Sequence, residues 1–481
     1  MRNKNHIRLL SSGEIEHVCE GEASVLGFDS PRCKDLVERL SLEVDSFNLS
    51  SDYANEIYLL FYLKKCEWSA QLDGLFKENI NLWPGGVQGV LWRLGLKEQC
   101  RLPLGALLLD HVRSFVLTAL AFLIVVLGSM LSPLYYMWRG AFSERTACLA
   151  ENVCIVRSSA TYTKICSAKK NIDVVLFSED ITYKNRSLSS VFSILSPKAT
   201  LCSLLQLPFI GVRDFVYICR DVYTLLGFEC IGDVAWYYSK RITSKAIYEV
   251  AFSALCKEKS VVQIYTGNKE DRYAMTEIRV AKCRKKRLVC IPHGLEYSIK
   301  FPTGVAGDVF YATSEYAAAY LNKLYDESKF IYDRMLMRDV FSRSRLCSTD
   351  EGGIKKIVYF SESRDVHVNL RIVKVLHRLG HNFGVRLHPK DLKRNYKDIG
   401  FDLKFEENYA DAICNSICIA RKSTVLLEAL FNGSTPIAYL EDSKDRYYVK
   451  YIFPSLAIEG ITQLFSESDL EKELSFLLEA K

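Results

Sequence analysis

The chain has 481 residues, of which 49% are hydrophobic and 25% are charged, a balance typical of a folded globular protein rather than a disordered one. Its length exceeds what one ordinary hydrophobic core holds, so two or three domains are expected. The net charge of +6, from 63 basic and 57 acidic residues, is too small to indicate nucleic-acid binding, but it is compatible with an anionic substrate or membrane surface.

The 16 cysteines are scattered along the chain and form no C-x-x-C pair. The closest two, Cys414 and Cys418, lie in or beside an apolar run and are expected in the core. The set therefore predicts reduced cytosolic thiols rather than a disulfide framework. Met1 to Asn5 are not followed by an apolar core, so we expect no secretory signal. Residues 1–113 mix short apolar runs with charge and predict no particular chemistry.

A long apolar segment, residues 114–138, contains no charged residue and lies between Arg113 and Arg139. Its length suits the hydrocarbon core of a bilayer, and the aromatic residues at its C-terminal end are typical of a membrane interface. We therefore predict a membrane segment, either a true span or an anchor that lies in the membrane plane. A buried core helix is the competing interpretation. Basic residues at both ends leave the orientation open.

From about residue 150 onwards, short apolar runs alternate with helical patterns, which predicts parallel α/β sheets. In the first half we expect strands at 171–177, 261–265, 288–291 and 307–313. A polar stretch with two glycines, residues 341–353, is expected to link two α/β domains, at 139–345 and 354–481. The second domain is expected to contain strands at 354–360, 383–387, 416–420 and 435–440.

Ligands bind at the carboxyl ends of the strands in such sheets. His293, in Pro292-His293-Gly294, follows one predicted strand, and an imidazole there suits a general base that removes a proton from an acceptor hydroxyl. The alternative is a histidine held by hydrogen bonds in a turn. Glu179 and Asp180 follow another strand and form an alternative base, although a solvated loop is the competing interpretation.

The second domain carries the residues expected to hold a phosphate. Arg386 and His388 alternate along one strand, so both can point the same way, and Pro389 fixes the chain after them. Ser423 and Thr424 begin a helical pattern, where hydroxyls and free backbone N–H groups can bind a phosphate.

Glu428 lies one helical turn beyond Thr424. It is expected either to accept the hydroxyls of a ribose or to form a surface ion pair with Lys422. Asn432-Gly433 then predicts the end of the helix.

Several common motifs are absent from the sequence. There is no G-x-x-x-x-G-K-[ST] loop, so the chain is not a P-loop enzyme. There is no G-x-G-x-x-G after a strand, which leaves a dinucleotide-binding fold unsupported. The lack of D-x-D at a strand end argues against a transferase that binds its nucleotide sugar through a metal ion. There is also no H-E-x-x-H zinc motif.

The ordered motifs His293-Gly294, His388-Pro389 and Ser423-Thr424 resemble those of bacterial transferases of the two-domain GT-B fold that build surface polymers. The similar families are the capsule-type sialyl and Kdo transferases and the CDP-glycerol glycerophosphotransferases. The resemblance covers roughly residues 260–440. It implies two Rossmann-like domains, with the acceptor on the first and the donor nucleotide on the second.

The two families imply different bases. In the glycerophosphotransferases a His-Gly histidine is the base, which maps onto His293. In the sialyltransferases the base belongs to an acidic-acidic-Gly motif, but Glu179-Asp180 is followed by Ile181. His388-Pro389 and Ser423-Thr424 map onto the motifs that hold the donor.

The resemblance implies a membrane-associated glycosyltransferase on the cytoplasmic face of a bacterial inner membrane. It would move a sugar from a nucleotide-activated donor, CMP- or CDP-linked rather than UDP-linked, to a polysaccharide or lipid-linked acceptor, without a metal or other cofactor and without nucleic acid. Three alternatives remain: glycerol phosphate transfer from CDP-glycerol, a non-catalytic membrane scaffold of the same fold, and a nucleotide-sugar epimerase.

Overall fold

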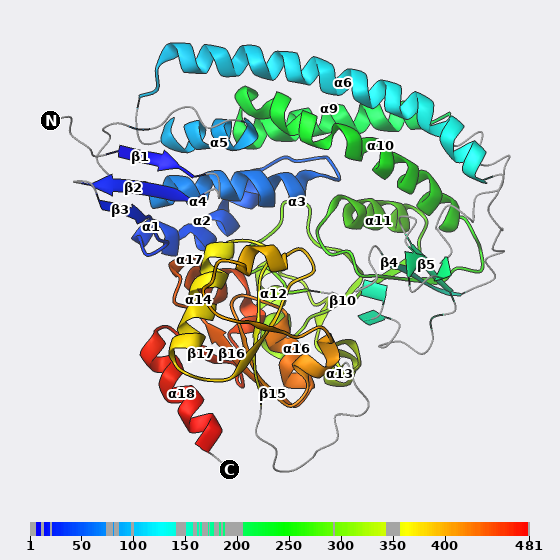
Figure 1. Cartoon of the computed structure of the whole chain (residues 1–481). Helices are drawn as coiled ribbons and strands as arrows, with labels where there is room; N and C mark the ends of the chain where they lie inside the picture. Colours follow the sequence, from blue (N-terminus) through cyan, green and yellow to red (C-terminus); the bar gives the residue numbers. More distant parts are fainter. Residues whose placement is uncertain are drawn as a thin grey trace.

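The computed structural model describes residues 6–10, 14–19, 22–73, 80, 86–97, 101–140, 151–156, 161–162, 164–165, 172, 174–177, 182–183, 186–187, 205–291, 294–342 and 356–479. Within these residues, two six-stranded sheets organise the chain, and all of their strand pairs are parallel (Figure 1). The predicted mixed α/β fold with parallel sheets is therefore confirmed.

The first sheet has the spatial order β11-β10-β9-β8-β4-β5. Its strands are β4 (Asn152–Val156), β5 (Val174–Phe177), β8 (Gln263–Thr266), β9 (Arg287–Cys290), β10 (Val309–Tyr311) and β11 (Phe330–Ile331). Its helices are α11 (Arg272–Cys283), α12 (Glu315–Tyr325) and α13 (Arg334–Phe341), and β6 (Thr182–Tyr183) and β7 (Arg186–Ser187) form a separate hairpin. Successive side chains of β4, β8 and β9 enter two different cores, because neighbouring strand residues face opposite sides.

The second sheet has the spatial order β14-β13-β12-β15-β16-β17. Its strands are β12 (Lys356–Phe360), β13 (Phe383–Arg386), β14 (Lys404–Phe405), β15 (Ser416–Ala420), β16 (Thr435–Tyr439) and β17 (Thr462–Leu464). Its helices are α14 (Val366–Arg378), α15 (Tyr409–Ile413), α16 (Val425–Phe431), α17 (Ser443–Tyr447) and α18 (Glu467–Glu479). Every residue of β15 is buried, as expected of a central strand covered on both faces.

Helices cover both faces of this second sheet. Ile417 and Ile419 share one core with α14 and α18, whereas Cys418 and Ala420 share another with α16. The alternation follows from the two-residue period of a strand. The helix α16 ends where Gly433 adopts a φ of +69°, which confirms the helix stop predicted at Asn432-Gly433.

A helical layer lies beside the first sheet and contains the long apolar segment. That segment is part of α6 (Leu104–Gly140), which runs alongside α9 (Leu207–Leu226) and α10 (Ile231–Leu255) (Figure 1). Residues Leu104–Ser132 are long and apolar enough to cross a membrane, judged by length and composition.

The N-terminal part contributes an antiparallel sheet and short helices: β1 (His6–Leu9), β2 (Ile15–Cys19), β3 (Glu22–Val25), α1 (Pro31–Lys34), α2 (Leu36–Glu43), α3 (Ala54–Ile57), α4 (Leu63–Gln71) and α5 (Gly86–Lys97).

Candidate functional site

A cavity of about 520 Å³ lies between loops of the two parallel sheets. The first sheet contributes the loops that follow β8 and β9, and the second contributes the loops that follow β12, β13 and β15, together with α17 and the chain after it, which follow β16. All of these loops begin at the carboxyl ends of their strands. The lining includes Lys269, Glu270 and Arg364, together with three residues predicted from the sequence, His388, Ser423 and Thr424.

The cavity meets the second sheet at its topological switch point. Numbered in chain order within this sheet, the strands have the spatial order 3-2-1-4-5-6, which is that of doubly wound nucleotide-binding sheets. The order reverses between β12 and β15. The loops that follow these two strands, residues 361–365 and 422–424, both line the cavity. The cavity therefore lies at the switch point, which is where doubly wound sheets bind their ligands.

The ring of His388 is oriented by its own loop. The backbone N–H of Lys390 donates a hydrogen bond to Nδ1 of His388 at 3.1 Å, and the N–H of His388 donates to Oγ of Ser361 at 3.1 Å. Because Nδ1 accepts, the proton of the neutral ring lies on Nε2. Burial, followed by the nearby Lys390, lowers the pKa of His388, which favours this neutral form. The ring can therefore donate one hydrogen bond through Nε2.

Ser423 and Thr424 lie directly before α16 and line the cavity. The N–H of Val425 donates to Oγ of Ser423 at 3.3 Å, so this oxygen acts as a local acceptor while its proton stays available. Within the part of the chain that the structure describes, the hydroxyl of Thr424 makes no hydrogen bond. Both hydroxyls can therefore donate to a ligand oxygen.

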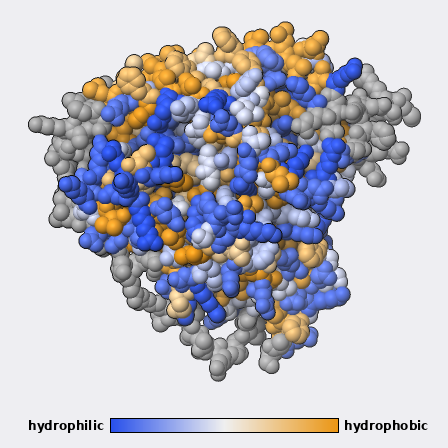
Figure 2. Space-filling model, turned by 180° about the vertical axis from the view of Figure 1, so that it is seen from behind, coloured by the Kyte–Doolittle hydropathy of each residue, from blue (hydrophilic) through white to orange (hydrophobic). Residues whose placement is uncertain are grey.

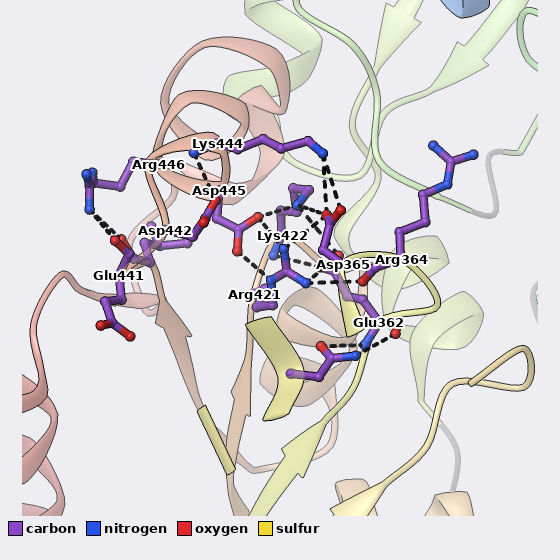
Figure 3. A network of polar contacts seen from close by, with 12 residues as sticks. Glu362, Arg364, Asp365, Arg421, Lys422, Glu441, Asp442, Lys444, Asp445 and Arg446 are labelled. Carbon is purple, nitrogen blue, oxygen red and sulfur yellow. Dashed lines mark hydrogen bonds and ion pairs between the residues drawn. The ribbon is translucent and has the colours of Figure 1, made fainter. Parts of the chain in front are cut away.

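A buried ion network fixes the loop that carries these hydroxyls (Figure 3). Arg421 is fully buried, and its Nε and Nη2 atoms lie 2.5 and 2.9 Å from the two carboxylate oxygens of Asp445. Its Nη2 also reaches Asp365 at 3.3 Å, and Lys422 pairs with Asp445. Burial alone would raise the pKa of Asp365, but the cations Lys444, Lys422 and Arg421 offset this and lower it to about 2. The network joins the loops after β12 and β15 to helix α17.

Two of the cavity-lining side chains that were not predicted from the sequence have functional groups suited to ligand chemistry, one in each sheet domain. Arg364 precedes Asp365, and Figure 3 shows its side chain leading away from the ion network. Among the described residues, no ion pair or hydrogen bond involves its guanidinium group. Arg364 follows the end of β12 closely, and this position after a predicted strand was the available signal.

Glu270 is the second such group, in the loop after β8. Its side chain is 19% exposed, and its nearest ionic partner is Nζ of Lys269 at 3.8 Å. Among the described residues, no hydrogen-bond donor reaches its carboxylate. Burial raises the pKa of Glu270, against the opposing charge of Lys269. A carboxylate whose pKa is raised takes up a proton more readily than an ordinary carboxylate, as a general base requires.

The other predicted residues lie elsewhere. Arg386 donates to the carbonyl oxygens of Glu406, at 2.8 Å, and Glu407, and Pro389 forms part of the turn after β13; neither lines the cavity. Glu428 also lies outside the lining. It is buried against Lys164, at 2.7 Å, rather than paired with Lys422 as one prediction held.

The predicted bases fall outside the described residues. This holds for His293, Glu179 and Asp180. Gly294, directly after His293, lines the cavity. Among the residues that the structure describes, no group of three or more histidine, cysteine or carboxylate side chains is placed to hold a metal ion. Metal independence remains a prediction.

No protein-family model matches the sequence, and a comparison with curated proteins finds no similar one.

Proposed function

We propose that the chain is a glycosyltransferase of the GT-B type that takes a nucleotide-activated sugar as donor. One observation carries the proposal: elements at the carboxyl ends of two parallel sheets surround one cavity, which is lined mostly by charged and polar residues. In sheets of this kind, ligands bind outside the carboxyl ends of the strands at the switch point. The donor nucleotide would lie on the second sheet and the acceptor on the first.

The second sheet supplies donors for the phosphates of the nucleotide. Nε2–H of His388, the hydroxyls of Ser423 and Thr424, and the guanidinium group of Arg364 all belong to the cavity lining. Hydrogen bonds to a charged group contribute about 1.5–3 kcal/mol each. Donors held in place before the reaction stabilise the negative charge that grows on the leaving nucleotide. The buried ion network keeps this loop in position.

The first sheet supplies the proton acceptor. As the acceptor hydroxyl oxygen attacks the anomeric carbon of the sugar, a base takes its proton and the nucleotide leaves with the bonding electrons. His293, predicted for this role, precedes the cavity residue Gly294. Glu270, which the structure describes, also lines the cavity from the first sheet, and its raised pKa suits general-base catalysis. Glu179 and Asp180 remain the sequence-based alternative.

The donor and acceptor follow from the resemblance of the motifs. CMP- or CDP-linked donors are proposed before UDP-linked ones, and the acceptor is a glycan or lipid-linked sugar at the cytoplasmic face of a bacterial inner membrane. Glycerol phosphate transfer from CDP-glycerol would use the same phosphate contacts. A non-catalytic scaffold would bind no nucleotide.

The first test is the thermal shift of the purified chain with CMP, CDP, UDP or GDP. We expect a cytidine nucleotide to raise the melting temperature of the wild-type protein but not of His388→Ala. His367→Ala is the matched control, because His367 lies on α14 outside the cavity lining. If no nucleotide stabilises the wild-type chain, the transferase proposal fails and the scaffold becomes the better interpretation. Turnover with CMP-sugars and CDP-glycerol then separates the two reactions.

A further inference from the structure

The helix α6 has its polar and apolar faces reversed relative to a helix of a water-soluble protein. Apart from Val125, the side chains that face the rest of the protein are small or polar, and they recur at helical spacing: Ala106, Asp110, Ser114, Ala121, Val125 and Ser129. Large apolar side chains point outwards, including Leu104, Leu108 and Phe115, the last of which is 69% exposed. A helix in water buries its apolar stripe and exposes its polar one.

The inward stripe is firmly attached to neighbouring helices. Asp110 accepts two hydrogen bonds from Arg93 of α5, at 2.6 and 2.8 Å. Oγ of Ser114 donates to the carbonyl of Phe228 at 2.7 Å and accepts from the N–H of Gly232 at 3.0 Å. A Cβ on Gly232 would collide with the backbone of Ser114. Close contact through small residues is the packing that apolar surroundings favour.

The helix α9 extends the outward apolar face. Its exposed side chains include Phe209, Val216 and Tyr223, and apolar groups gather along the upper edge of the molecule in Figure 2, where Figure 1 places α6. Contiguous apolar surface of this extent marks an interaction site.

The exposed charged side chains on this layer are basic. All of the acidic side chains in residues 101–132 and 205–255 are buried: Asp110, Asp214, Asp221, Glu229, Asp233 and Glu249. Of the basic side chains in the same segments, Arg101, Arg220 and Lys240 are exposed, whereas Lys245 is buried against Asp214 and Glu249. A surface that combines apolar and basic groups without exposed acidic ones complements an anionic phospholipid layer.

The chain on either side of α6 lies on the same side of any membrane. Before α6, the N–H of Ser51 donates to Asp221 of α9 at 2.8 Å, and Glu56 pairs with Arg272 at 3.0 Å. Tyr448, near the C-terminus, donates to Glu67 at 2.9 Å. A helix that crossed the bilayer once would place these partners on opposite sides and break every such contact.

We infer that α6 and α9 form one membrane-binding face that lies in the plane of an anionic bilayer and enters a single leaflet. The helix α6 is thus an in-plane anchor and not a span. Only the choice of the cytoplasmic leaflet rests on the proposed function.

The test is flotation of the full chain with preformed vesicles of phosphatidylcholine, with or without phosphatidylglycerol. We expect the wild-type protein to float, more completely with phosphatidylglycerol, and the Leu108→Glu/Phe115→Glu double variant to lose at least about tenfold in bound fraction, because charges within an acyl layer are strongly unfavourable. Phe476→Glu is the matched control, since Phe476 on α18 is 67% exposed and lies far along the chain. The changed side chains point outwards, so the melting temperature should be preserved.

Two further measurements distinguish an in-plane anchor from a membrane span and from a protein dimer. In inverted membrane vesicles, epitope tags at both chain ends should be accessible to added protease; protection of one tag would show a span and overturn the inference. If the face joins two copies instead, light scattering would show a lipid-free dimer that the double variant converts to monomers, with no vesicle binding by the wild type. Nucleotide binding is measured separately, so its failure would overturn the proposed function and leave this result standing.

Discussion

Nζ of Lys164 lies 2.7 Å from a carboxylate oxygen of Glu428, and less than a tenth of either side chain is exposed. Tyr409 donates to the other oxygen of Glu428 at 2.7 Å. The pair joins a segment that follows β4 in the first sheet to α16 of the second. It thereby links the two sheets, and it occupies the carboxylate that the sequence had suggested as a ribose ligand.

The Glu428→Gln variant should lower the free energy of unfolding by about 3 kcal/mol, because the buried Lys164 ammonium would lose a carboxylate partner at 2.7 Å. The thermal shift produced by a cytidine nucleotide should persist, since Glu428 does not line the cavity. Chemical denaturation and nucleotide titration of the same sample check both statements. Normal stability together with lost nucleotide binding would instead make Glu428 the predicted ribose ligand.

Arg364→Ala should weaken nucleotide binding about tenfold or more while leaving stability unchanged. A charge-assisted hydrogen bond contributes about 1.5–3 kcal/mol, and the guanidinium group has no partner among the described residues that its removal would strand. Arg378→Ala is the control, because Arg378 is an exposed arginine of α14 paired with Glu467. Isothermal titration of the three proteins gives the comparison. Equal affinities in wild type and Arg364→Ala would remove Arg364 from the donor site.

The sequence predicts the second sheet well because its local signals agree with its tertiary structure. Residues 416–420 form a short apolar run, and the structure buries all of them in a central strand. His388, Ser423 and Thr424 then meet in one cavity, because the carboxyl ends of parallel strands lie at one edge of a sheet.

The sequence could not show ion pairs between residues that are far apart along the chain. Lys164 and Glu428 are 264 positions apart, and no local pattern connects them. The direction in which α6 faces is equally hidden, because both of its faces are uncharged over most of their length and only neighbouring helices decide which one is covered. Arg364 and Glu270 lie in loops, where a polar residue is ordinary and only the fold gives it a role.

Glu270→Gln should lower kcat by about 10²-fold or more while the nucleotide-dependent thermal shift persists, since a positioned general base contributes about 10²–10⁴. Glu327→Gln, at an exposed position after α12, is the control for a neutral substitution in the same sheet domain. His293→Ala is assayed beside it. If turnover survives in Glu270→Gln and disappears in His293→Ala, the base is His293 and Glu270 has no part in the proton transfer.

The stability of the first sheet should depend on pH through Glu277, which lies directly behind the cavity. Its carboxylate is fully buried and accepts hydrogen bonds of 2.6 Å from Tyr248 and from Asn268, a cavity-lining residue. Burial raises the pKa of Glu277 from 4.5 to about 7. Because the folded state holds this proton more tightly than the unfolded state, its contribution to stability is complete below about pH 4.5 and disappears as the pH rises through about 7.

Glu277→Gln removes this titration but keeps the size of the side chain and one acceptor oxygen. Relative to wild type, the free energy of unfolding of the variant should therefore rise by about 3 kcal/mol between about pH 4.5 and pH 8, following the conversion of about 1.4 kcal/mol per pKa unit. Chemical denaturation of both proteins across this range measures the difference. Parallel pH profiles would show that Glu277 has the same pKa, near 4.5, in the folded and unfolded states, and Asn268 would then be held in the cavity wall by a buried anion at neutral pH.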